Sequence, residues 1–320
     1  MKQKRTYLKL KRKYLYLILI ILLLCSLAPY AKRVDYWIID IFSHFPVQYA
    51  FIAVILSSVC LWKRYLVPAL LAAILFVFNI SLIVDNGNLA RASLQKVKTF
   101  TVTSANINKS NSALSKVVNR LQAAHSDILL LLEVTEENVA SLQPLIQNYP
   151  YRIINLNIGT SGRGMALMSK LPILDHTVTK YSEFGNMLVE TAMKVDNKKI
   201  SFYGVHFQKP INVSEFSKRT NQIVSLARHI KEQTNSVIIA GDFNTTPFSP
   251  IFKKLLNESG LKDTRDGFGW LPSWPAYFPP LWISIDHILV SPDIAVHKRE
   301  TGTYISSDHY PVHAELSIAN

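Results

Sequence analysis

The sequence predicts a layered α/β domain that follows a group of membrane-spanning helices. Long apolar stretches occupy the N-terminal part, whereas shorter apolar runs alternate with helical patterns from Phe100 to the C-terminus. The 320 residues suffice for one large domain and an accessory segment. We therefore expect residues 1–98 to form a membrane region with a short tether, and residues 99–320 to fold as a separate domain.

Three apolar stretches in the N-terminal region are close to the length of roughly 20 residues that crosses a hydrocarbon core. The first, at 15–31, follows a basic leader, and the third, at 65–84, contains no charged residue. The middle one, at 43–62, is polar near its start and uninterrupted from 49 to 62. We expect about three transmembrane helices, of which the second and third form a hairpin.

Basic residues predict how these spans are oriented. The leader is rich in Lys and Arg, and Lys63-Arg64 follows the second span. Because basic loops stay in the cytoplasm, three spans place the N-terminus inside and everything after Val84 outside. A cleaved signal peptide is the alternative for the first stretch, although residues 28–31 offer no convincing cleavage site. Either way, the C-terminal domain is predicted to be extracytoplasmic.

The net charge of +13 is divided unequally along the chain. Residues 1–98 hold 14 Lys and Arg but 3 Asp and Glu, a net charge of +11, whereas residues 99–320 hold 21 and 19, a net charge of +2. The excess therefore indicates membrane topology rather than nucleic-acid binding. Both cysteines, Cys25 and Cys60, lie in apolar stretches, so the later domain has no disulfide.

Short apolar runs after the tether have the length of β-strands. They lie at 100–105, 128–134, 165–169, 200–205, 237–240, 285–290 and 312–318. Apolar residues at helical spacing lie between some of them, at 112–124 and 214–233. This alternation predicts strands inside and helices outside, and the sequence shows no internal repeat.

Polar residues stand where these strands would end. The clearest example is Gly241-Asp242-Phe243-Asn244, in which an apolar run breaks at a glycine and presents an Asp and an Asn two residues apart. The others are Asn106, Glu133, His206, Asp286, Asp308 and His309. One such residue is more often a turn or cap residue, as Glu133 could be for a helix beginning near Thr135. Together they predict a site built on rigid strand ends.

Ordered sequence segments carry a family pattern. They are SANIN (104–108), LLLLEV (129–134), GRGMALMSKLPI (162–173), YGVHFQKP (203–210), GDFN (241–244), SIDHILVS (284–291) and SSDHYPV (306–312). With this order and spacing, the chain from about Phe100 to its end resembles the endonuclease/exonuclease/phosphatase superfamily, and most closely its membrane-anchored bacterial members. The resemblance implies a four-layer α/β sandwich, with two central β-sheets flanked by helices, and divalent-metal-dependent hydrolysis of a phosphoester.

The resemblance also implies a metal site. Glu133 would be the principal ligand of Mg²⁺ or Mn²⁺, helped by Asn106 and Asp308, because hard divalent cations prefer oxygen ligands. A catalytic ion of this kind keeps open positions for water and substrate. Arg163 and Arg219 are expected near the rim of the site.

The remaining strand-end residues receive catalytic roles from the same resemblance. Asp242 would orient or deprotonate the attacking water, and Asn244 would bond a phosphoryl oxygen. His309 would contact the phosphate, with Asp286 holding its ring in one tautomer. His206 corresponds to a second phosphate-side histidine, although a histidine at a strand end can simply bond a backbone carbonyl.

The segment 268–282 is too rich in proline for a regular element and carries six aromatic residues just before Asp286. We expect it to be a loop over the site. Its aromatic residues could pack on the domain's own core, enter the membrane interface, or stack on the bases of a single strand. The three alternatives remain open at this point.

The expected partners are the lipid bilayer and a phosphoester substrate, and no stable protein partner is expected. The substrate is either nucleic acid or a phospholipid or its phosphorylated headgroup. Near-neutral charge in residues 99–320 weakens the first, because binding to a phosphate backbone usually draws on clustered Lys and Arg. The alternative function is a catalytically silent, membrane-tethered binding module with the same fold.

Overall fold

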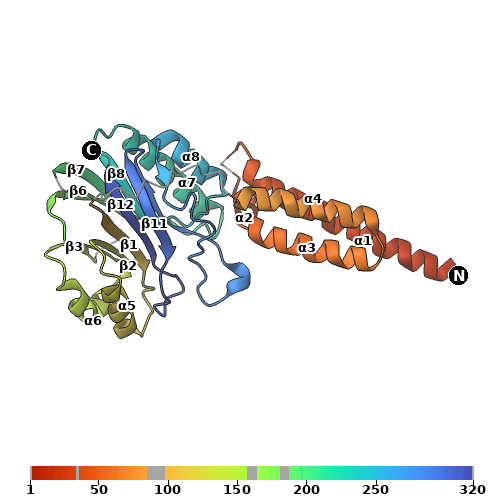
Figure 1. Cartoon of the computed structure of the whole chain (residues 1–320), viewed down its shortest axis with the longest axis horizontal. Helices are drawn as coiled ribbons and strands as arrows, with labels where there is room; N and C mark the ends of the chain where they lie inside the picture. Colours follow the sequence, from red (N-terminus) through yellow and green to blue (C-terminus); the bar gives the residue numbers. More distant parts are fainter. Residues whose placement is uncertain are drawn as a thin grey trace. The chain divides into compact units, whose positions relative to one another are not determined.

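The computed structural model describes residues 2–33, 36–84, 98–156, 164–180, 187–195 and 197–318, and of 2–12, 177–180 and 187–188 it describes the backbone alone. The chain divides into two compact units. One is Met1–Asp85 with Phe248–Pro250, and the other is Asn86–Pro247 with Ile251–Asn320. The long apolar helices belong to the first unit and the β-strands to the second (Figure 1).

Helices make up the first unit: α1 (Lys2–Leu27), the short 3₁₀ helix η1 (Ala28–Tyr30), α2 (Trp37–Ser43), α3 (Pro46–Trp62) and α4 (Leu66–Ile83). Helix α1 includes the basic leader as well as most of the span expected at 15–31. Helix α3 begins at Pro46, a residue favoured in the first turn because its missing N–H needs no partner there. The span expected at 43–62 corresponds to α3, and α2 precedes it at an angle of 64° across a short break.

Small residues and side-chain hydrogen bonds hold these helices together. Ala53 of α3 and Ala72 of α4 are fully buried in a cluster that includes Leu22 of α1. Asn79 of α4 donates from Nδ2 to Ser26 Oγ of α1 at 2.8 Å. The windows Lys13–Tyr30 and Leu66–Ile83 are long and apolar enough to cross a membrane, and the bent pair gives up to three such spans. Their outward faces are apolar and exposed, as expected of helices that lipid surrounds.

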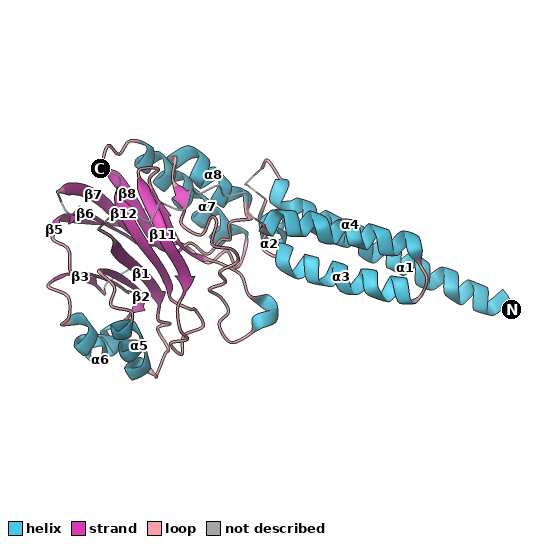
Figure 2. Cartoon of the chain, viewed as in Figure 1, coloured by secondary structure: helices cyan, strands magenta, loops and turns pink. Residues whose placement is uncertain are grey.

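Two six-stranded sheets lie at the centre of the second unit, as described by the structure (Figure 2). The first has the order β11 (Ile294–Thr301), β12 (Val312–Ile318), β1 (Phe100–Asn106), β2 (Ile128–Val134), β4 (Gly164–Ser169) and β3 (Tyr151–Asn155). The second has the order β5 (Ile173–Lys180), β6 (Met187–Val195), β7 (Lys198–His206), β8 (Ser236–Asp242), β10 (Asp286–Val290) and β9 (Lys262–Asp263). Both are mixed, since β1–β2 and β7–β8 are parallel and the other pairs are antiparallel.

The central strands are buried on both faces. In β2, Leu130 and Leu132 belong to the core between the sheets, while Leu129 and Leu131 pack with the outer helices α5 (Leu114–Ala123) and α6 (Glu136–Ile146). This double burial explains why the strand reads as an uninterrupted apolar run.

Helices also cover the outer face of the second sheet. Tyr203 of β7 packs edge-on against His229 of α7 (Val213–Lys231), with ring centroids 5.8 Å apart. Phe252 of α8 (Pro250–Ser259) packs on His287 of β10 at 4.5 Å. The order of layers is helices, sheet, sheet, helices, and the predicted four-layer sandwich is confirmed.

The predicted strands correspond to the buried ones. The runs expected at 128–134 and 312–318 are β2 and β12 with the same ends. Strands β3, β5, β6, β9 and β11 are absent from the predicted set, and all but β6 lie at a sheet edge. Edge strands mix polar and apolar residues, so they lack the apolar run by which a strand is recognised.

A buried charge cluster supports the second sheet. Asp263 is nearly inaccessible, and its Oδ2 lies 3.5 Å from Arg265 Nε and 3.6 Å from His287 Nδ1. Burial alone would raise the pKa of Asp263, but the neighbouring His287 ring and the charge of Arg265 together lower it well below its usual range. A lowered pKa stabilises the folded state above about pH 4, and this contribution is lost as the pH falls further.

We predict that Asp263→Asn lowers the free energy of unfolding by about 3–5 kcal/mol at pH 7, because it leaves the buried Arg265 guanidinium without its counter-charge. Thermal unfolding of the full-length protein in detergent measures the effect. Asp175→Asn, at an exposed position of the same domain, serves as the control. An unfolding midpoint equal to that of the control would show that the cluster contributes little.

Candidate active site

The strand-end residues meet at one end of the two sheets. Strands β7 and β8 run parallel and end together, with His206 in register with Asp242. Strand β10 runs the opposite way and begins at Asp286, which faces Asp242. In the other sheet, β1 runs parallel to β2 and ends at Asn106. Residues distant in sequence are therefore brought to the same edge.

The two-residue repeat of a strand decides which way these side chains point. Asp242 lies two residues after Ala240, which belongs to the core between the sheets. Asn106, His206 and Asp286 stand at even spacings from other residues of the same core. All four are buried. The site is thus the polar end of the space between the sheets.

Glu133 reaches the site through an irregularity in its strand. The pairing of β2 with β4 shifts between Leu132 and Val134, and Glu133 has a φ of 62°. Regular alternation would turn it to the helix-covered face, so the bulge re-aims the side chain. Its Oε1 lies 3.3 Å from Asn106 Nδ2, and its Oε2 accepts a hydrogen bond from the Lys109 backbone N–H at 3.1 Å.

The turn after β8 depends on Gly241. Its φ is 147°, and a Cβ at this position would lie 1.8 Å from the carbonyl oxygen of Val205. The glycine lets the chain present Asp242, whose Oδ1 accepts from the Asn244 backbone N–H at 2.9 Å and whose Oδ2 lies 3.3 Å from Asn106 Nδ2. Asn244 itself has a φ of 49°. Strained backbone of this kind often marks a functional site.

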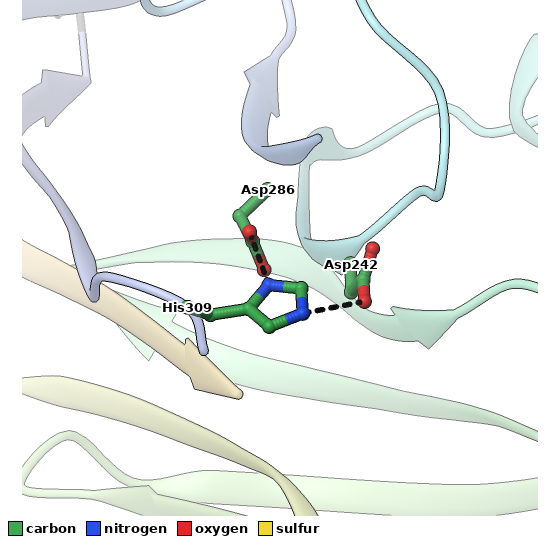
Figure 3. Close-up of side chains that lie close together, drawn as sticks. All are labelled: Asp242, Asp286 and His309. Carbon is green, nitrogen blue, oxygen red and sulfur yellow. Dashed lines mark hydrogen bonds and ion pairs between the residues drawn. The ribbon is translucent and has the colours of Figure 1, made fainter. Parts of the chain in front are cut away.

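His309 lies between two carboxylates (Figure 3). Its Nδ1 is 2.8 Å from Asp286 Oδ2, and its Nε2 is 3.8 Å from Asp242 Oδ2. Burial alone would lower the pKa of His309, but the charge of Asp286 and the hydrogen bond with it, joined by Asp242 and Asp308, raise it to about 9. The ring is therefore cationic at neutral pH and can donate from both nitrogens.

The model of the Endonuclease/Exonuclease/phosphatase family matches residues 103–309, which include every strand-end residue described above. The chain belongs to this family. The resemblance predicted from the ordered segments is confirmed. The chain therefore has the phosphoesterase fold of this family.

Solved structures of the family share this architecture. The protein from Beutenbergia cavernae gives a TM-score of 0.59 at 17% identity, over 70% of this chain and 72% of that one. A family protein from Bacteroides thetaiotaomicron gives 0.58 at 18%, over 71% and 100%. D. rerio TDP2, complexed with a single-strand DNA product, gives 0.56 at 16%, over 69% and 99%. At these identities the likeness shows the fold alone. No curated protein sequence matches the chain.

His206 lies beside the carboxylates at the sheet ends. Its Nε2 lies 3.6 Å from Asp242 Oδ2 and 3.9 Å from Glu133 Oε1. Lys209, which the sequence analysis does not single out, brings its Nζ to 3.7 Å from the same Glu133 oxygen and is partly exposed. Its place three residues after His206, in the family segment YGVHFQKP, is the signal that could have identified it.

Asn244 and Asp308 have protein partners on the described part of the site. Asn244 Nδ2 donates to the Phe207 carbonyl at 2.8 Å, which leaves its second N–H for another acceptor. Asp308 accepts from Asn108 Nδ2 at 2.7 Å and from the indole N–H of Trp274 at 3.3 Å. Asn108 and Trp274 are further residues that the sequence analysis does not include. The proposed metal-binding role of Asp308 remains a prediction.

The prediction that Arg219 lies near the rim is wrong. Its side chain is fully buried, and Nη1 donates to the backbone carbonyl of Asn244 at 2.6 Å. Its guanidinium also lies over the ring of Phe216, 5.3 Å from the centroid. Arg219 therefore supports the Gly241–Asn244 turn from behind. Arg163 lies outside the described residues.

The donors near Glu133 fit a hard divalent cation. Glu133 Oε1 and Asp242 Oδ2 both lie 3.3 Å from Asn106 Nδ2. Asn106 Oδ1 accepts a hydrogen bond from the Asn108 backbone N–H at 3.1 Å and keeps a second lone pair for a cation. Asp242, Asp286 and His309 also lie close enough to hold an ion. However, a His309 ring protonated on both nitrogens has no lone pair for a metal, so the side of Glu133 and Asn106 is the better candidate.

Proposed function

We propose that this protein is a membrane-tethered, extracytoplasmic hydrolase that cleaves a phosphoester with the help of Mg²⁺ or Mn²⁺. The observation that carries the proposal is a continuous cluster at the sheet ends. Contacts of 2.8 to 3.8 Å connect its members in sequence: Asp286, His309, Asp242, Asn106 and Glu133. Apolar residues could fill the same space without the cost of burying charges, so stability does not explain a buried array of carboxylates and one imidazolium. Such arrays are typical of functional sites.

Asp242 is the proposed acceptor for the proton of the attacking water. Burial above all, and then the charge of Asp286, raise the pKa of Asp242 to about 7. A general base whose pKa is near the working pH is partly unprotonated and is also basic enough to accept a proton from water in the transition state. A divalent cation held by Glu133 and Asn106 would supply charge neutralisation at the phosphoryl group.

The His309–Asp286 pair is the proposed stabiliser of negative charge on the phosphoryl oxygens. Asp286 accepts the Nδ1–H bond and fixes the ring, so that the Nε2–H is available on the side of Asp242. Because both groups are buried, the protonated ring acts in a medium of low polarity, where charge stabilisation is strong. Lys209 and the second N–H of Asn244 are further candidate donors to the phosphate.

Glu133→Gln should raise the metal concentration required for half-maximal activity by at least about tenfold, because it removes the charged metal ligand. The readout is a Mg²⁺ or Mn²⁺ titration of hydrolysis by the full-length protein. The exposed Glu137 of α6 provides the matched control, Glu137→Gln. A titration curve equal to that of the control would remove Glu133 from the metal site.

The proposed location follows from the apolar helices and the basic residues around them. With three spans, the leader and Lys63-Arg64 face the cytoplasm and the hydrolase domain faces outward. We predict that a reporter active only outside the cytoplasm is active when fused after Lys98. Fusion after Lys63 provides the opposite control. Activity of a cytoplasm-dependent reporter after Lys98 would invert the topology.

Two substrate classes are compatible with this site. The single-strand DNA product bound to D. rerio TDP2 keeps nucleic acid among them, whereas a membrane tether and a net charge of +2 in residues 99–320 favour a phospholipid or its headgroup. A panel of DNA, RNA, phospholipids and sugar phosphates, offered to the full-length protein with Mg²⁺ or Mn²⁺, separates these classes. Binding of one class without turnover would support a silent binding module instead.

A further inference from the structure

The loop between β9 and β10 ends in an exposed apolar tip. Tyr277, Phe278 and Leu281 are 69%, 47% and 43% exposed, and Pro279 and Pro280 between them are exposed as well. These five consecutive residues are here named the apolar tip. In Figure 1 the loop, drawn in blue with a short helix at its end, stands away from the two sheets. Isolated exposed apolar residues are common, but an uninterrupted group of five on one loop indicates a contact surface.

The base of this loop is held by backbone hydrogen bonds and one side-chain hydrogen bond. Ala276 N–H donates to the carbonyl of Asp308 at 2.7 Å, and Tyr310 OH donates to the carbonyl of Ala276 at 3.1 Å. Ile283 N–H donates to the Trp274 carbonyl at 2.7 Å. The apolar tip is therefore presented in an ordered form, so that binding through it costs little further conformational entropy.

A row of aromatic rings continues from the loop onto the domain. The ring of Trp282 lies 6.3 Å from Trp270 and 6.1 Å from Tyr310, which in turn lies 6.0 Å from Tyr304. The ammonium of Lys116 sits 4.7 Å from the centre of the Tyr304 ring. Tryptophan and tyrosine next to a lysine are the residues that proteins place at the level of lipid headgroups.

The composition of the loop excludes the usual chemistry of a polar partner. From Phe268 to Ile285 the chain contains no Asp, Glu, Lys, Arg or His. A loop that binds nucleic acid would need cationic side chains to contact the phosphate backbone. Most transient protein interfaces have a charged or polar rim. An uncharged, aromatic and proline-rich tip matches the boundary between headgroups and acyl chains.

We propose that the apolar tip, Tyr277–Leu281, inserts into the headgroup region of the bilayer to which the same chain is anchored. Candidate membrane helices end at Ile83, and the described domain resumes at Lys98. Even fully extended, a segment of this length reaches roughly 50 Å, at 3.3–3.6 Å per residue. The tether therefore keeps the tip at high effective concentration beside the bilayer, and a few apolar side chains suffice for a stable contact.

This contact would orient the active site toward the membrane. The loop that carries the tip bonds Asp308 at two points, through the backbone N–H of Ala276 and the indole of Trp274. His309 follows Asp308 directly. A tip held at the headgroup level would consequently bring the predicted phosphate-binding end of the sheets next to the bilayer surface. The lipid contact itself does not depend on the proposed hydrolysis and can be measured in an inactive protein.

Fluorescence quenching by lipids tests the proposal on the full-length protein. Cys25 and Cys60 are replaced by alanine, and Tyr277→Cys is labelled with an environment-sensitive fluorophore. The protein is reconstituted into vesicles of phosphatidylethanolamine and phosphatidylglycerol, with and without nitroxide-labelled lipids. Lys198→Cys is the matched control, because it is exposed at the end of β7 opposite His206.

The label at position 277 should shift to the blue and lose about half or more of its fluorescence to shallow nitroxides, as expected for a side chain some 5–10 Å into the headgroup boundary. The label at position 198 should show neither change. Equal quenching of the labels at the two positions would overturn the proposal. A blue shift at position 277 that grows with protein concentration in detergent, without quenching by nitroxide lipids in vesicles, would also overturn it, because it would indicate contact with a second copy of the chain. If Tyr277→Cys does not fold, Leu281→Cys gives the same readout.

Discussion

Replacing Asp242 with asparagine should lower the rate of phosphodiester hydrolysis by at least about 100-fold without unfolding the protein. The change removes the proposed proton acceptor and alters the shape of the side chain very little. An amide oxygen can still accept the hydrogen bond from the Asn244 backbone at the position of Oδ1. Hydrolysis of bis-p-nitrophenyl phosphate measures the rate, and the thermal unfolding midpoint reports on the fold.

A matched control separates the site from the rest of the domain. Asp175 is an exposed aspartate on β5, so Asp175→Asn removes the same charge at a distance from the sheet ends. It is expected to leave turnover unchanged. A near wild-type rate in Asp242→Asn, or an equal loss in both variants, would refute the role assigned to Asp242.

His309→Ala should also lower turnover by at least about 100-fold, because it removes the cationic donor that faces the site. Alanine leaves the buried carboxylate of Asp286 without this partner, so some loss of stability is expected as well. His309→Asn separates the two effects, since its amide can still donate toward Asp286. It should regain stability but not activity. His176→Ala, at an exposed position on β5, is the control, and turnover of His309→Asn near the wild-type level would contradict the assignment.

Much of the fold could be predicted because its central strands are buried on both faces. The apolar run of β2 is continuous because both faces of the strand are buried. The run of β8 breaks at Gly241 because the backbone of Val205 comes too close for a side chain. Edge strands such as β5 and β11 are less completely buried, so fewer of their positions must be apolar. Their polar residues face solvent, and the sequence therefore contains no local sign of them.

The sequence predicts which residues form the site better than it predicts which atoms of those residues are in contact. Strand ends and two-residue spacing turn Asn106, His206, Asp242 and Asp286 toward the same side of their strands as the apolar core residues. The bulge at Glu133 does not follow from sequence, because it appears only when β2 is paired with β4. Residues at 108, 209, 219 and 274 act through tertiary contacts made far away in the sequence.

Divalent-metal-dependent hydrolysis of bis-p-nitrophenyl phosphate by the full-length protein tests the central claim most directly. Purified protein in detergent is assayed with Mg²⁺ or Mn²⁺, with excess chelator, and beside Asp242→Asn prepared in the same way. We predict turnover that requires the metal and is lost in the variant. A folded wild-type protein that binds the metal but shows no turnover with either ion, or turnover equal to that of Asp242→Asn, would contradict the account and favour a binding module.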